Sequence, residues 1–327
     1  WLGTFAVYLV TRRGLAAPRP SHAAEAAPTL EIGAAAPDFE LPGVDGRRYT
    51  LASFAQAEVL VIIFTANHCP TAQAYEARIE RLAAEYRPRG VEIVLVSPND
   101  PLALRLDEQG FSDLGDGFEE MKLRARERGW TFPYLYDGET QAMSHRYGPV
   151  ATPHVFVFDS RRLLRFGGRI DDNENPAKAT SADTRDAIEA LLAGKPVPQP
   201  RTKVFGCSIK WADKRAWVER GFEEWAREPV TMTPVDLAGV KALAQGDARK
   251  LRLVNVWATW CAPCVVEFPD LVTLNRIYRG RDFEVVTLNA DDQNQKEKAR
   301  ALLVEKQASL RNLSWSSDDP YRMIEAL

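Results

Sequence analysis

The chain has 327 residues, about twice the roughly 150 residues of a typical domain, so two domains are expected. Apolar residues make up 45% and charged residues 27%, which excludes a disordered chain, a collagen and a polytopic membrane protein. The net charge of −3 gives no basic excess, so nucleic-acid binding is not predicted. Four cysteines are too few for a disulfide scaffold. Two of them form a C-x-x-C motif, which favours redox or metal chemistry.

The first 28 residues differ in composition from the rest of the chain. Residues 1–10 are apolar, Arg12 and Arg13 follow, and an Ala- and Pro-rich stretch continues to Pro28. This pattern is typical of the end of a signal peptide or of a membrane anchor. We therefore expect an extracytoplasmic protein, either released into the periplasm or tethered to a membrane and facing outward.

A shift of 192 residues superposes two parts of the chain without a gap. Residues 59–64 and Cys69 fall on residues 251–256 and Cys261, and a second apolar run starting at Val91 keeps the same offset. Each copy has the pattern of a strand, a cysteine turn, a helix and a second strand, with the β-branched runs typical of buried parallel strands. Each cysteine is therefore expected where a strand ends and a helix begins, within a β-α-β crossover.

Further elements are predicted around the first copy. They are a hairpin at Asp45-Gly46, strands over 132–136, 153–158 and 163–166, and a helix over 183–192. The Pro-rich residues 194–200 mark a domain boundary. We expect a leader or anchor over 1–28, a first domain over 29–200, a linker with Cys207 and a Trp-rich helix over 201–229, and a second domain over 230–327.

The C-x-x-C motif, in residues 257–264 (WATWCAPC), is the strongest chemical signal. The N-terminus of a helix favours the thiolate of Cys261, which makes this residue the attacking nucleophile. Cys264 is placed to attack the mixed disulfide that results. Haem attachment needs C-x-x-C-H, but Val265 follows Cys264, and the four histidines lack the spacing of a zinc site. No cofactor and no metal are predicted.

Residues 251–289, with this motif and the following Glu267-Phe-Pro, resemble the TlpA/ResA branch of the thioredoxin-like proteins. The resemblance implies a thioredoxin fold, exported and often anchored to a membrane, which reduces disulfides in partner proteins with an external thiol electron donor. Trp260 and Pro263 are supporting residues of the motif. Thioredoxins have a buried aspartate where Asn255 stands, so help for the resolving thiol is expected from Glu267. The second domain is expected to be incomplete at the C-terminus.

Residues 29–210 resemble the redoxin (AhpC/TSA) family, with the closest likeness to a peroxiredoxin-like subgroup. The resemblance is carried by APDFEL at 36–41, TANHCP at 65–70 and ATP at 151–153. It implies that Cys69 is the nucleophile and that Thr152-Pro153 is the cis-proline pair that shapes the substrate groove. The whole chain is thus expected to be an α/β protein of two thioredoxin-like domains, each a central mixed sheet flanked by helices.

The surroundings of Cys69 differ from both patterns. Ala72 stands where a thioredoxin has its second cysteine, and Thr65 lies four residues before Cys69, whereas peroxiredoxins have threonine three before. The helix start favours a reactive thiolate. His68 is a candidate supporting residue that would assist as a cation, and a structural or indifferent role is its alternative, because a side chain adjacent in sequence often points away. An inert buried thiol is the alternative.

Cys207 follows Gly206, which is expected to act as a flexible hinge. Our hypothesis is that Cys207 resolves Cys69, and that the Cys261/Cys264 dithiol then reduces the resulting disulfide. An unpaired surface cysteine is the alternative for Cys207.

Several functions compete on these residues. The first is thiol-disulfide exchange with a protein disulfide, and the second is a thiol peroxidase at Cys69 that acts on peroxide. The third is a redoxin domain that only docks a partner. Metal handling lacks a histidine pair, and the acidic residues 99–117 lack EF-hand spacing. Reductants and oxidants share the C-x-x-C motif, so the redox direction stays open.

Overall fold

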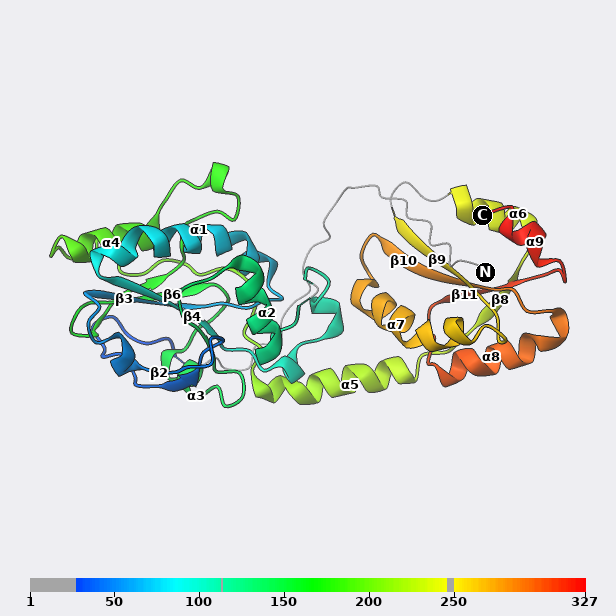
Figure 1. Cartoon of the computed structure of the whole chain (residues 1–327), viewed down its shortest axis with the longest axis horizontal. Helices are drawn as coiled ribbons and strands as arrows, with labels where there is room; N and C mark the ends of the chain where they lie inside the picture. The colour runs from blue at the N-terminus through cyan, green and yellow to red at the C-terminus, as the bar shows by residue number, and fades with distance from the viewer. Residues whose placement is uncertain (1–27, 113, 246–249) are drawn as a thin grey trace. The chain divides into compact units, whose positions relative to one another are not determined.

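The computed structural model describes residues 28–112, 114–245 and 250–327. The predicted leader, apart from Pro28, lies outside the described residues. The chain divides into two compact units, and among the described residues the first ends at Val218 and the second begins at Glu219 (Figure 1). None of the helices in the described residues has the length and apolar character needed to cross a bilayer.

The first unit is built on a five-stranded mixed sheet with the order β5-β4-β3-β6-β7. Strand β3 pairs in parallel with β4 and antiparallel with β6, and a separate hairpin of β1 and β2 precedes the sheet. The bounds are β1 Glu40–Pro42, β2 Arg48–Thr50, β3 Val59–Phe64, α1 Pro70–Tyr86, β4 Val91–Ser97, α2 Phe118–Arg128, β5 Tyr134–Tyr136, α3 Ala142–Tyr147, β6 His154–Phe158, β7 Leu164–Gly168 and α4 Asp183–Leu192.

Strand β3 is apolar throughout because both faces of its sheet are covered. Val61 and Ile63 pack into a cluster with α1, α2 and α4, whereas Leu60 and Ile62 pack with the β1-β2 hairpin and α3. Successive side chains of a strand point to opposite faces, so the unbroken apolar run requires cover on each side. The predicted hairpin, strands and helix α4 are confirmed.

The second unit contains the parallel part of the same kind of sheet. Its four strands have the order β8-β11-β10-β9, and every pair is parallel. Helices α7 and α8 pack on one face, and α6 and α9 on the other (Figure 1). The bounds are β8 Met232–Val235, α6 Leu237–Gln245, β9 Leu251–Trp257, α7 Ala262–Tyr278, β10 Phe283–Asn289, α8 Lys296–Glu305, β11 Arg311–Trp315 and α9 Pro320–Ile324.

The two sheets differ beside their first crossover strand. In the first unit β3 pairs with β4 along one edge and with β6 along the other. In the second unit β9 pairs with β10, and among the described residues no strand pairs with its other edge. Six of the seven β9 residues are consequently half-buried, whereas β3 is fully buried. The mixed sheet that was predicted for both domains is present in the first unit, and its parallel part in the second.

The predicted internal repeat is confirmed in three dimensions. Helices α1 and α7 have 17 residues each, and β4 and β10 have seven each, at the offset seen in the sequence. The strand registers also agree, since Val59 lies opposite Val91 in the first unit and Leu251 opposite Phe283 in the second. The two cysteine turns therefore occupy equivalent places.

Much of the segment that was expected to be a linker packs on the first unit. Arg201 forms a bridge with Gly167, Ile209 and Lys210 are buried, and the ring of Trp211 stacks on His145 at 4.5 Å. The first compact unit therefore continues past the Pro-rich stretch to Val218. The Trp-rich helix is α5, Arg215–Ala226.

Candidate functional site

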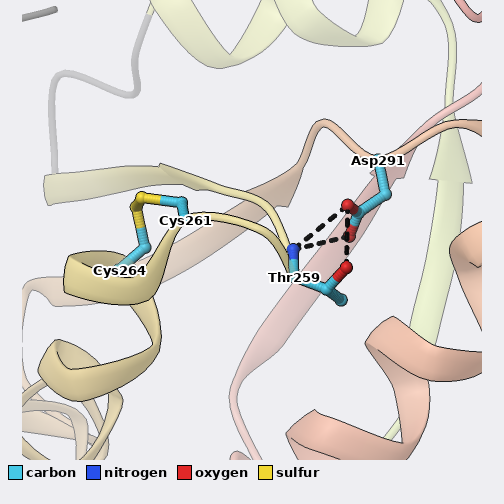
Figure 2. Close-up of a disulfide and its surroundings, with 4 residues drawn as sticks. All are labelled: Thr259, Cys261, Cys264 and Asp291. Carbon is cyan, nitrogen blue, oxygen red and sulfur yellow. Dashed lines mark hydrogen bonds between the residues drawn. A yellow bond between two sulfur atoms is a disulfide. The ribbon is translucent and has the colours of Figure 1, made fainter.

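The C-x-x-C cysteines of the second unit form a disulfide at the start of α7. Cys261 is the residue directly before the helix and Cys264 lies in its first turn, with 5.3 Å between their Cα atoms (Figure 2). Both cysteines are half-buried, Pro263 is exposed, and the indole of Trp260 is 75% exposed. The sulfur pair is thus bordered by an exposed aromatic side chain, which suits contact with another protein.

The carboxylate of Asp291 holds the turn that leads to Cys261. It accepts hydrogen bonds from the Thr259 amide at 2.9 Å and from the Thr259 hydroxyl at 3.1 Å, as Figure 2 shows. The side-chain amide of Asn289 donates a further bond at 2.7 Å. Asp291 is buried, so these donors compensate for its desolvation. Sequence analysis missed Asp291, although Asn99 holds the equivalent place in the repeat.

Asn255, which cannot accept a proton, and Glu267, the expected proton acceptor, lie in different surroundings. The side-chain oxygen of Asn255 on β9 is buried, and no hydrogen-bond partner for it is found in the described part of the chain. Glu267 is exposed on α7. The role of Glu267 as a proton acceptor stays a prediction.

Cys69 occupies the place in the first unit that Cys261 has in the second. It directly precedes α1 and is fully buried, and its Sγ accepts a hydrogen bond from the Ala72 amide at 3.3 Å. When protonated, the thiol donates to the Thr152 carbonyl at 3.2 Å. Ala72 stands at the position of Cys264, so Cys69 has no partner within its own turn.

The partner near Cys69 comes from residues 205–210, which we call the strap. Cys207 and Thr152 exchange two backbone hydrogen bonds, with N···O distances of 2.9 and 3.2 Å. The Cys207 side chain is half-buried and packs against Cys69, and both thiols are free. The predicted cis peptide bond between Thr152 and Pro153 is confirmed. The structure thus brings Cys69, Cys207 and the Thr152-Pro153 pair together.

Gly206 permits a close approach of the strap to Thr152. Its φ is +143°, and a Cβ atom there would lie 2.0 Å from the Thr152 carbonyl oxygen. No larger residue fits without a shift of the backbone. The close contact lies next to the two backbone hydrogen bonds between Cys207 and Thr152. The flexible hinge expected at Gly206 stays a prediction.

The environment of Cys69 stabilises its thiolate. Burial raises the pKa of Cys69, but hydrogen bonds from the Cys207 thiol and the Ala72 amide, and the charge of His68, lower it to about 6. The pKa of Cys207 is raised, first by its hydrogen bond with Cys69 and then by burial. Cys69 is therefore the thiolate of the pair and Cys207 the protonated donor.

His68 is held by a residue that sequence analysis did not single out. Its Nδ1 lies 2.5 Å from the Asp116 carboxylate, and both residues are buried. Asp116 belongs to the acidic residues 99–117, which the sequence offers only as a candidate metal loop. No group of three or more metal-ligating side chains is found in residues 28–112, 114–245 and 250–327.

Comparisons with known proteins agree with this geometry. Residues 32–166 match the AhpC/TSA family and residues 235–316 match the family described as Redoxin. The chain is a redoxin/thioredoxin-like protein with two domains. Each of its cysteine turns lies within one of the two matched regions.

Three relatives illustrate the similarity of this redoxin/thioredoxin-like chain. Thiol-disulfide oxidoreductase ResA of Bacillus thuringiensis subsp. konkukian is 32% identical over 69 residues, 21% of this chain and 40% of that protein. Thiol:disulfide interchange protein HelX of Rhodobacter capsulatus is 59% identical over 27 residues, 8% of this chain and 15% of that protein. An uncharacterized conserved protein of Geobacillus kaustophilus, of known structure, is 34% identical, with 64% of this chain and 98% of that chain covered and a TM-score of 0.49. The chain spans 40% of the length of its ResA relative.

Proposed function

We propose that this protein is an extracytoplasmic thiol-disulfide oxidoreductase that works through Cys261 and Cys264, with Cys69 as a second redox-active thiol. The observation that carries the proposal is the Cys261–Cys264 disulfide at the start of α7, beside an exposed Trp260. Relatives of the chain, matched over part of its length, are named thiol-disulfide oxidoreductase and thiol:disulfide interchange protein.

The reaction is a two-electron exchange. The thiolate of reduced Cys261 attacks one sulfur of a substrate disulfide, a mixed disulfide forms, and the other substrate sulfur leaves as a thiolate. Cys264 then attacks Cys261, which closes the observed disulfide and releases the second substrate thiolate. The two substrate thiolates take protons from solvent, and an external thiol donor returns two electrons to the cysteine pair.

The substrate of Cys261 is a protein disulfide. Next to the sulfur pair, Trp260 and Val266 are 75% and 77% exposed, so apolar surface is available where a partner's disulfide must approach. A disulfide between Cys69 and Cys207 is one such substrate, either within one molecule or between two copies. Cys261 attacks the half-buried Cys207 sulfur, because Cys69 is fully buried and its low pKa makes it the better leaving group.

A second candidate function is peroxide reduction at Cys69, and the strap favours it. While Cys207 is paired with Thr152, an external polypeptide cannot pair there, so a small oxidant reaches Cys69 more readily. The Cys69 thiolate attacks the peroxide oxygen, which yields a sulfenic acid and releases an alcohol or water. Cys207 then attacks the sulfenic sulfur, so that water leaves and the Cys69–Cys207 disulfide forms.

The exchange function is tested by reduction of insulin disulfides with dithiothreitol as the electron donor. We expect the full chain to accelerate the reaction, Cys261→Ser to abolish it and Cys69→Ser to retain it. An active Cys261→Ser variant would contradict the proposal. The reduction potential of the Cys261/Cys264 pair tells whether the protein donates or accepts electrons. A value near about −270 mV indicates a reductant, and a value near about −120 mV indicates an oxidant.

Two further measurements separate the remaining alternatives. Dimedone labelling of Cys69 after peroxide treatment, with rapid peroxide consumption that Cys69→Ser loses, would support the peroxidase. Equal activity of the chain and Cys69→Ser in both assays would support a first domain that only docks a partner. The extracytoplasmic location is tested by fusing residues 1–28 to alkaline phosphatase, which is active only after export.

A further inference from the structure

We propose that Asp116 is a positioning residue for Cys69, because its carboxylate holds both the ring and the backbone amide of His68 directly before the nucleophile. This inference rests on the proposed function of Cys69 as a redox-active thiol. It assigns a role to a carboxylate that lies 48 residues from His68 in the sequence.

Asp116 is a fully buried carboxylate just before α2, and each of its hydrogen bonds serves the cysteine turn or its support. One oxygen accepts from the backbone amide of His68 at 3.1 Å. The other lies 2.5 Å from His68 Nδ1 and accepts from the Asn99 side chain at 2.7 Å. A buried carboxylate is costly unless it is paired with a positive charge. His68 supplies that charge when both of its ring nitrogens are protonated.

The imidazole acts directly next to the reacting sulfur. His68 is 2% exposed and precedes Cys69 in the chain, so Asp116 fixes both its ring and its backbone. Its Nε2 is buried, and no hydrogen-bond partner for it is found among the described residues. The charge of His68 is one of the influences that lower the pKa of Cys69. Burial raises the pKa of Asp116, and the charge and hydrogen bonds of His68 overcome that effect and lower it.

The other titratable groups near Cys69 do not take over the role of the His68–Asp116 pair. Burial raises the pKa of Tyr134, and burial with the Arg201 charge lowers that of His154 to about 3, so both residues are neutral. Beside the strap, Lys210 is paired with Glu108 at 2.6 Å. Glu120 accepts from the amides of Gly115 and Gly117 on either side of Asp116. Further groups are the protonated Cys207 on the strap, Asp100 paired with Arg215, and Glu174, which accepts from Thr71.

In the described residues of the second unit, the cysteine turn lacks a counterpart of the His68–Asp116 pair. There Asp291 accepts the Thr259 amide directly, Trp260 precedes the nucleophile, and Cys264 supplies a partner sulfur in the same turn. The first unit has Ala72 in place of that sulfur. The buried His68–Asp116 pair is thus found in the copy whose nucleophile has no cysteine in its own helix turn.

The experiment measures the pKa of Cys69 without any turnover. In the full chain with Cys261 and Cys264 replaced by serine, thiolate absorbance is followed against pH, and the part lost on Cys69→Ser belongs to Cys69. We expect Asp116→Asn to raise this pKa by about one unit. Nitrogen NMR of the His68 ring should also change on this substitution, because the ring loses the carboxylate at its Nδ1.

The control is Glu76→Gln, which removes another buried carboxylate that joins α1 to α2, through Arg124 at 2.9 Å. It should lower stability and leave the Cys69 pKa unchanged. If Asp116→Asn fails to fold, the double variant His68→Gln/Asp116→Asn removes both charges together and should also raise the pKa. An unchanged Cys69 pKa in a folded variant would overturn the proposal. A chain that lacks turnover but shows the shift would refute the proposed function alone.

Discussion

Cys207 pairs with Thr152 through two backbone hydrogen bonds of 2.9 and 3.2 Å, which places the strap across the edge of the sheet where Cys69 lies. In the first domain the nucleophile beside this bridge is fully buried. In the second domain the sulfur pair is half-buried beside an exposed tryptophan. The two copies of one fold thus differ in how far their cysteines are exposed.

Replacing Gly206 with alanine should release the strap. The new Cβ atom would lie 2.0 Å from the Thr152 carbonyl oxygen, and a strained backbone costs about 1–3 kcal/mol. Labelling of Cys207 by iodoacetamide should accelerate by about tenfold, the factor that corresponds to about 1.4 kcal/mol. Gly194→Ala is the matched control, since Gly194 also has a positive φ but nothing lies within 4 Å of its added Cβ. Equal labelling of both variants would show that the strap is not held at Gly206.

Replacing Ala72 with cysteine should give the first domain a dithiol in its own helix turn. The Ala72 amide already lies 3.3 Å from Cys69 Sγ, and the equivalent pair in the second unit forms a disulfide. Peptide mapping of oxidised A72C should find Cys69 linked within α1 and Cys207 free. Ala74→Cys, at an exposed position of the same helix, should leave Cys69 available to Cys207. A Cys69–Cys207 link in A72C would refute the equivalence of the two turns.

Removing the Asp291 carboxylate should loosen the turn before Cys261. Asp291→Ala leaves the Thr259 amide and hydroxyl without their acceptor, which costs about 1–3 kcal/mol for each buried donor left unpaired. We expect a lower urea midpoint for the second unit and slower insulin reduction. Asp292→Ala removes a neighbouring carboxylate that is exposed and should change neither quantity. Similar losses in both variants would mean that charge, rather than the Thr259 contact, matters.

Acid should destabilise the first unit through His154. Burial, with the Arg201 charge, lowers the pKa of His154 to about 3, whereas an unfolded histidine has a pKa of about 6.5. Between these values the unfolded state binds one more proton, so stability falls as the pH falls, by up to about 1.4 kcal/mol per pH unit. Pulse proteolysis in urea, read from first-unit peptides, should show a shallower slope for His154→Gln. The exposed His145→Gln should keep the original slope, and an unchanged slope in His154→Gln would contradict the assignment.

The repeat and most of the elements could be predicted from the sequence, because both depend on local patterns. The apolar runs at Val59 and Leu251 mark the strands, and Gly194 marks the end of α4 at the predicted residue. The cysteines at the two helix starts follow from the same offset. These signals lie within a few residues of the elements they specify.

The count of lone cysteines suggests that Cys207 lies near Cys69, as it does. The pairing of Cys207 with Thr152 and the contact of Asp116 with His68 could not be predicted, because both join distant segments. Cys207 forms an isolated bridge with Thr152 and is not part of a strand. The strap therefore has no alternation of apolar and polar residues from which this pairing could be predicted. The partner of His68 comes from a loop 48 residues away. The acidic composition of residues 99–117 does not distinguish the one carboxylate that becomes fully buried.

The most direct test of the whole account is to trap the exchange between the two domains. Cys264→Ser removes the resolving thiol, so a mixed disulfide formed by Cys261 persists. The full-length variant is reduced, oxidised with a limiting amount of peroxide, and mapped by mass spectrometry without reduction. We predict that Cys261 is recovered linked to Cys207, within one molecule or between two. Recovery of free Cys261 beside an accumulated Cys69–Cys207 disulfide would contradict electron transfer between the domains.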